Sequence, residues 1–193
     1  MNKLLYYFGK NLTEGDASMK SILGGKGANL AQMCKLNLPI PPGFTISTEL
    51  CQEYSKNSSI FTQQIVDDIK SYIAKLEQET GKQFGGNNPL LLSVRSGAKI
   101  SMPGMMDTIL NLGINDEVAD RLSKLTNNPR FVYDSYRRFI EMFSTVVLGI
   151  PAYHFEEILE NCKINNDYEK DSELSVLDLQ DLVVKYKNIV KRH

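Results

Sequence analysis

Residues 90–113 read LLLSVRSGAKISMPGMMDTILNLG and are the most informative stretch of the sequence. Its three leucines lead to Arg95, and the run predicts a buried strand that ends at a cation. The sequence SMPG at 101–104 then predicts a loop, before a second apolar run around residues 109–110. Arginine has five fixed donors that match phosphate oxygens, and glycine lets a backbone approach them. The stretch therefore suits the binding of a polyanion.

Arg95 also has a structural interpretation. An arginine at the end of a strand often makes a salt bridge, or extends its apolar stem toward the surface. The planar fork of donors serves carboxylates as well as phosphates, so chemistry alone does not separate the two interpretations.

The composition is that of an ordinary globular protein. The chain has 193 residues, of which 42% are apolar and 23% are charged, and a net charge of −1. This balance argues against a nucleic-acid partner or an anionic membrane surface, although it leaves room for a local basic pocket. No apolar run approaches the length of a membrane span.

The cysteines and the N-terminus suggest a compartment. Cys34, Cys51 and Cys162 form no CxxC pair, and the first two fall in apparently helical patterns, which predicts buried, reduced thiols. The apolar stretch at residues 4–8 is too short for a signal peptide. We therefore expect a reducing, cytoplasmic location.

The two parts of the chain differ in glycine content and in the spacing of apolar residues. Of the 13 glycines, only Gly149 lies beyond residue 114. Short strands and helices separated by glycine loops predict an α/β lobe at 1–114, and apolar residues at helical spacing predict a helical subdomain at 115–193. The fold class expected is therefore α+β.

Local signals set several expected boundaries. Strands are expected at 4–8 and 44–46, and helices at 28–36 and 60–79. The helix expected at 28–36 carries Leu30, Met33 and Cys34 on one side. Further helix starts are marked by Ser47 or Thr48, by Asn128 before Pro129, and by Ser175 with Asp178 in a capping box.

The sequence Gly24-Gly25-Lys26-Gly27 lies at an expected helix start. Successive N–H groups and the helix dipole there could bind a phosphate, with Lys26 adding a mobile charge. The spacing is not that of a Walker A loop, and a glycine-rich turn with a solvated lysine is the alternative.

Other motifs give weaker evidence of a functional site. Met102, Met105 and Met106 are core filler or the lining of an apolar nucleotide slot, and Asp107 is a lone carboxylate. The sequence Tyr136-Arg137-Arg138 predicts a solvated basic face on an otherwise apolar helix.

Four blocks of sequence together resemble pyruvate phosphate dikinase. The blocks are GGKGANLAQM at 24–33, IPPGFTI at 40–46, SVRSGA at 93–98 running on to SMPGMMDTILNLG at 101–113, and NPRF at 128–131 with YDSYRRF at 133–139. The resemblance covers nearly all of the chain up to about residue 155. The related water dikinases, of the phosphoenolpyruvate synthase type, share the GGK and Val-Arg-Ser segments but carry a different, acidic loop where this chain has SMPGMMDT.

The resemblance implies a reaction. The family interconverts ATP, phosphate and pyruvate with AMP, diphosphate and phosphoenolpyruvate. Its N-terminal part is an ATP-grasp-type nucleotide-binding domain, a mixed sheet with helices, and it passes a phosphoryl group to a histidine on a swivelling domain. A C-terminal domain then phosphorylates pyruvate.

The resemblance also implies site residues. Lys26 and Arg95 match the family's ATP-phosphate contacts, where they would act in catalysis by neutralising charge on the transferring phosphoryl group. The family's nucleotide loop matches Ser101, Met102, Pro103, Gly104, Met105, Met106 and, next to them, Asp107.

The remaining parts of such an enzyme are expected outside this chain. The resemblance places the Mg²⁺ ligands, the phosphorylated histidine, the pyruvate site and the homodimer contacts beyond residue 193. We therefore expect an N-terminal fragment that is monomeric, holds no metal ligands and is inactive alone. The alternatives are a related dikinase such as phosphoenolpyruvate synthase and a non-catalytic docking fragment.

Overall fold

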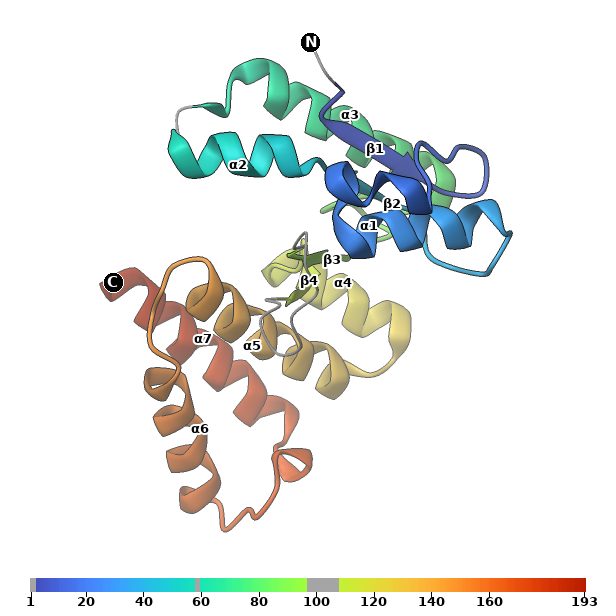
Figure 1. Cartoon of the computed structure of the whole chain (residues 1–193). Helices are drawn as coiled ribbons and strands as arrows, with labels where there is room; N and C mark the ends of the chain where they lie inside the picture. Colours follow the sequence, from blue (N-terminus) through green and yellow to red (C-terminus); the bar gives the residue numbers. More distant parts are fainter. Residues whose placement is uncertain (1–2, 58–59, 97–107) are drawn as a thin grey trace. The chain divides into compact units, whose positions relative to one another are not determined.

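The computed structural model describes residues 3–57, 60–96 and 108–193, which form two compact units. The first unit holds the chain up to residue 82, and the second holds residues 83–95 and 108–193. Figure 1 shows short strands among longer helices in both units. Among the described residues, no helix is both long and apolar enough to cross a membrane.

The first unit is a two-stranded antiparallel sheet with helices. Its strands are β1 (Leu5–Phe8) and β2 (Gly43–Ile46), paired so that Leu5 lies opposite Ile46 and Phe8 opposite Gly43. The helices are the 3-10 helix η1 (Ala17–Met19), α1 (Lys20–Lys35), α2 (Thr48–Lys56) and α3 (Gln63–Thr80). Both strands and α2 contact α1.

Capping residues fix the helix boundaries of this unit. The Ser47 side chain accepts a hydrogen bond from the Leu50 N–H at the start of α2, and Thr62 accepts one from the Ile65 N–H at the start of α3. Gly81, at φ 67°, ends α3 in the left-handed conformation. The expected choice between Ser47 and Thr48 is thereby decided in favour of Ser47.

The second unit is a helical bundle with one strand pair. Strands β3 (Leu92–Arg95) and β4 (Thr108–Leu112) are antiparallel, with Arg95 opposite Thr108. The helices are α4 (Asp116–Thr126), α5 (Pro129–Val146), α6 (Tyr153–Asn165), the 3-10 helix η3 (Asp171–Glu173) and α7 (Val176–Arg192). Helix α5 contacts α7, α4 and β4, and α7 also contacts α6 (Figure 1).

An aromatic pair lies in the core of the second unit. Phe155 and Tyr186 are fully buried, their rings meet edge to face at 5.0 Å, and the Tyr186 hydroxyl donates to the Phe155 carbonyl at 3.1 Å. The expected caps also form here. Asn128 accepts from the Phe131 N–H with Pro129 in the first turn, and Ser175 and Asp178 make a capping box.

The α+β class is confirmed, and the strands differ from expectation in two ways. The described residues form two separate antiparallel pairs, where a mixed sheet was expected. The strand leading to Arg95 was expected to be buried, yet Ser93, Val94 and Arg95 are exposed. A strand in a two-stranded sheet has one neighbour and is not a central strand, which explains the exposure. The division at residue 114 stays a prediction; β3 and β4 group with the helices that follow them.

One expectation about side chains in the first unit is wrong. Cys51 is exposed, although it is a free thiol as expected. The buried face of α1 carries Leu23, Ala28 and Ala31, whereas Met33 is 36% exposed. Small residues let this helix lie close to its neighbours, so the buried face is not the one with the largest apolar side chains.

Candidate functional site

The glycine motif lies at a break inside α1. Gly24 has φ 68° and ψ 169°, so the helix that begins at Lys20 stops there and a second helical segment starts at Gly25. The first N–H groups of a helical segment have no partner within the helix. The expected helix start is thus confirmed, and its backbone donors belong to Gly25, Lys26 and Gly27.

The three glycines of the motif have different environments. Gly24 has the positive φ that a residue with a side chain rarely adopts. Gly27 lies against β2, because a Cβ atom there would be 2.7 Å from the Oγ1 atom of Thr45. At Gly25 a Cβ atom would meet no atom of the described residues within 4 Å. Two of the glycines are therefore explained by the fold, and Gly25 is left facing open space.

Lys26 is half-buried beside this open position. Within 3–57, 60–96 and 108–193, its ammonium group makes no ion pair. A cation beside the N–H groups at a helix start suits the binding of an anion.

Arg95 lies at the end of β3 in the second unit. It is exposed, and the described residues offer it no ion-pair partner, so the structural salt bridge finds no support. Arg95 pairs with Thr108, so the residues that flank 96–107 in the sequence lie opposite each other in the strand pair. The expected nucleotide loop, Ser101 to Met106 with Asp107, lies outside the described residues.

The structure places the two cations in different units. Convergence of Lys26 and Arg95 on one nucleotide stays a prediction. Among the described residues there is also no cluster of three or more His, Cys, Asp or Glu side chains that could hold a metal ion.

The environment of Arg137 differs from the solvated one that was predicted. It is 2% exposed rather than solvated, and its Nη2 atom lies 2.7 Å from Asp171 Oδ2 and 2.9 Å from Asp134 Oδ1. Its Nη1 atom is 3.9 Å from Glu141, and burial raises the pKa of that carboxyl group. The polar segment before α7 is therefore bound to α5 through Asp171.

A spacing signal for this burial was present in the sequence. Helix α5 buries Val132, Tyr136, Ile140 and Ser144 at intervals of four, and Arg137 lies three residues before Ile140. Acids at Asp134 and Glu141 stand three residues before it and four after it. Arg138, by contrast, is exposed as expected.

The prediction of phosphate binding rests on two features: a helix start beside Lys26, and the exposed Arg95 at the end of a strand. The sequence matches the family described as "Pyruvate phosphate dikinase, AMP/ATP-binding domain" over residues 20–65 and 57–169. The chain belongs to this family.

Relatives named pyruvate, phosphate dikinase match almost the whole chain. The protein of Rickettsia prowazekii is 53% identical over 98% of this chain, and that of Clostridium symbiosum is 51% identical over 99%. A relative from Flaveria trinervia, named as chloroplastic, is 51% identical over 97%. The chain spans about a fifth of the length of these relatives, with coverage of 22%, 22% and 20%.

Proposed function

We propose that this domain binds ATP and that Lys26 and Arg95 contact its phosphate groups. The observation that carries the proposal is the break at Gly24, which gives α1 a second N-terminus beside Lys26. Oriented N–H groups and a lysine stabilise negative charge without rearranging at the moment of reaction. Arg95 would add a planar fork of donors for the phosphate oxygens.

The nucleotide loop is the second part of the proposal. Ser101 to Met106 and Asp107 would cover the bound nucleotide, since they join the strand that ends at Arg95 to the strand that begins opposite it.

We further propose that the whole protein is a pyruvate phosphate dikinase, a phosphotransferase with paired acceptors. It would convert ATP, phosphate and pyruvate to AMP, diphosphate and phosphoenolpyruvate through a phosphohistidine. The names of the relatives and their identity over nearly all of this chain support this assignment over a water dikinase. Dependence of the whole protein's activity on inorganic phosphate tests the choice, because a water dikinase needs none.

The partners follow from that assignment. We expect Mg²⁺ ligands, the swivelling phosphohistidine domain and the pyruvate domain outside this chain, with the whole protein a cytoplasmic homodimer and this chain a monomer. The net charge of −1 supports neither a nucleic-acid partner nor an anionic membrane surface. The chain alone should not turn over ATP, and formation of AMP by the purified chain would contradict this.

Calorimetric titration with ATP tests the binding proposal. Lys26→Met and Arg95→Ala should each weaken binding by about tenfold or more, because each removes a charged hydrogen bond to phosphate. Lys20→Met, which changes an exposed lysine of the same helix, is the matched control and should bind like the unmodified chain. If the chain binds no ATP, or the substitutions change nothing, a non-catalytic docking role becomes the better interpretation.

A further inference from the structure

The loop at residues 83–90 leads into β3, the strand that ends at Arg95. Gln83 closes this loop, because its carbonyl accepts hydrogen bonds from the Gly86 N–H at 3.2 Å and the Leu90 N–H at 2.7 Å. Leu90, where the loop ends, is 7% exposed. The loop is therefore a defined turn that fixes the point from which the strand starts.

Arg121 of α4 holds this loop. Its Nη1 atom donates to the Gly85 carbonyl at 3.1 Å and to the Gly86 carbonyl at 3.0 Å. Its Nη2 atom donates to the Glu117 carboxylate at 3.1 Å. Hydrogen bonds from a charged donor are stronger than neutral ones, and the planar guanidinium group fixes their directions. One side chain thus ties the loop to α4 at two adjacent carbonyl groups.

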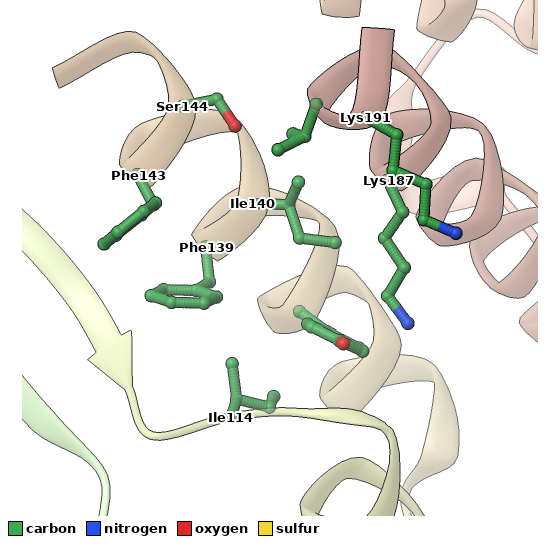
Figure 2. A pocket seen from close by; sticks show the side chains of 9 residues that line it. Ile114, Phe139, Ile140, Phe143, Ser144, Lys187 and Lys191 are labelled. Atoms are coloured by element: carbon green, nitrogen blue, oxygen red, sulfur yellow. The ribbon is translucent and has the colours of Figure 1, made fainter. Parts of the chain in front are cut away.

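The base of the partner strand β4 is held by apolar packing. Ile114, two residues after β4, is 5% exposed, and Figure 2 shows its side chain directed toward Phe139 of α5, with which it lines one pocket. A Cβ atom added to Gly113 would lie 2.8 Å from the ring of Phe84, a residue of the loop. The bases of the two strands therefore meet where Phe84 lies against Gly113.

Arg95 lies at the opposite end of this strand pair. A two-stranded pair is at best marginally stable alone, so its direction depends on what holds its base. Arg95 follows Leu90 by five residues, which is up to about 17 Å of extended chain, so a tilt of a few degrees at the loop moves Arg95 by about 1 Å. Misplacement of a binding group by about 1 Å is enough to weaken its contacts.

We propose that Arg121 is a positioning residue for the phosphate site. It holds the carbonyl groups of Gly85 and Gly86, and thereby directs β3 so that Arg95 meets the phosphates of the nucleotide. The inference rests on the proposed function, in which Arg95 contacts ATP, and adds a residue that acts through Arg95. Every residue in it belongs to the second unit.

A double-mutant cycle with Arg95 tests the proposal. Calorimetric titration with ATP should show that Arg121→Ala weakens binding by about threefold to fivefold, as expected for coupled residues. In the Arg95→Ala background, Arg121→Ala should cause no further weakening, because a positioning residue has no effect once the residue that it positions is removed. Equal weakening in both backgrounds would overturn the proposal. So would unchanged ATP affinity in Arg121→Ala when Arg95→Ala binds more weakly.

Arg130→Ala is the matched control for a loss of stability. Arg130 also donates to two backbone carbonyl groups of the second unit, those of Leu174 at 2.9 Å and Asp171 at 2.7 Å. Its removal should lower the melting temperature and leave ATP affinity unchanged. Glu117→Gln, which keeps both carbonyl contacts of Arg121, should bind ATP like the unmodified chain. An equal loss of ATP affinity in Arg130→Ala and Arg121→Ala would contradict a specific role for Arg121.

Hydrogen exchange without nucleotide separates this inference from the proposed function. The Leu90 amide should exchange faster in Arg121→Ala than in the unmodified chain, because the loop is released from α4. Unchanged exchange at Leu90 would overturn the positioning role and leave ATP binding by Arg95 standing. If exchange is faster but Arg95→Ala binds ATP like the unmodified chain, the proposed function fails, and the positioning role fails with it.

Discussion

A Cβ atom added to Gly27 would lie 2.7 Å from the Oγ1 atom of Thr45. Helix α1 therefore approaches β2 closely, and only a residue without a side chain allows this contact. A Cβ atom added to Gly25, two residues earlier, would meet no atom of the described residues within 4 Å. The fold accounts for Gly27, whereas the proposed phosphate contact would account for a glycine at Gly25.

Substitution of these two glycines should have opposite effects on stability. Gly25→Ala should raise the free energy of unfolding by up to about 1 kcal/mol, because alanine is the better helix former and meets no neighbour. Gly27→Ala should lower it by about 1–3 kcal/mol, as overpacking does. Chemical denaturation followed by circular dichroism measures both. Gly25→Ala should also weaken ATP binding despite its greater stability, and unchanged ATP affinity in that variant would count against phosphate contact at this backbone.

The ion pair between Arg137 and Asp171 should stabilise the second unit. Asp171→Asn should lower the free energy of unfolding by about 1–3 kcal/mol, because it weakens a charged hydrogen bond to a guanidinium group that is 2% exposed. Asp167→Asn, in the exposed turn just before, is the control and should change little. Equal stabilities of the two variants in urea would show that the buried arginine does not depend on Asp171.

Glu14 should make the first unit sensitive to acid. Burial alone would raise its pKa, but hydrogen bonds from Lys3 Nζ, the Tyr7 N–H and the Tyr72 hydroxyl lower it overall. A carboxyl group with a lowered pKa stabilises the fold above its unfolded pKa, and this stabilisation is lost as the pH falls through the folded pKa. The stability difference between the unmodified chain and Glu14→Gln should therefore be constant above about pH 5 and shrink below about pH 4. Glu53→Gln, at an exposed glutamate of the same unit, controls for the loss of a carboxyl group.

The Tyr186 hydroxyl should contribute to the core of the second unit. Tyr186→Phe keeps the ring contact with Phe155 but leaves the Phe155 carbonyl without this donor. We expect a loss of about 1 kcal/mol in the free energy of unfolding. Tyr153→Phe, at an exposed tyrosine, should cost less. Thermal unfolding of the unmodified chain, Tyr186→Phe and Tyr153→Phe would show whether Tyr186→Phe loses more stability than Tyr153→Phe.

Sequence reasoning located the helix starts well because capping is local. Asn128 with Pro129, and Ser175 with Asp178, satisfy the first N–H groups of their own helices, so their signal needs no knowledge of the rest of the fold. The resemblance to the family was equally accessible, since it rests on the order and spacing of sequence blocks, and the match over residues 20–65 and 57–169 confirms it.

What sequence reasoning missed depends on contacts between distant residues. Arg137 pairs with Asp171, which lies 34 residues away in the sequence, and no local pattern predicts that pair. The buried face of α1 carries small residues where the helix lies close to Thr45, and the sequence pattern alone does not show that closeness. The kink at Gly24 was likewise not predicted, although a helix start just after it was.

The central claim is that the helix start after Gly24 binds the phosphates of ATP. Amide signals of ¹⁵N-labelled chain, recorded during titration with ATP and separately with adenosine, test this most directly. The Gly25, Lys26 and Gly27 signals should shift in a saturable way with ATP and should not shift with adenosine. Saturable binding of ATP that leaves these three signals unmoved would contradict it.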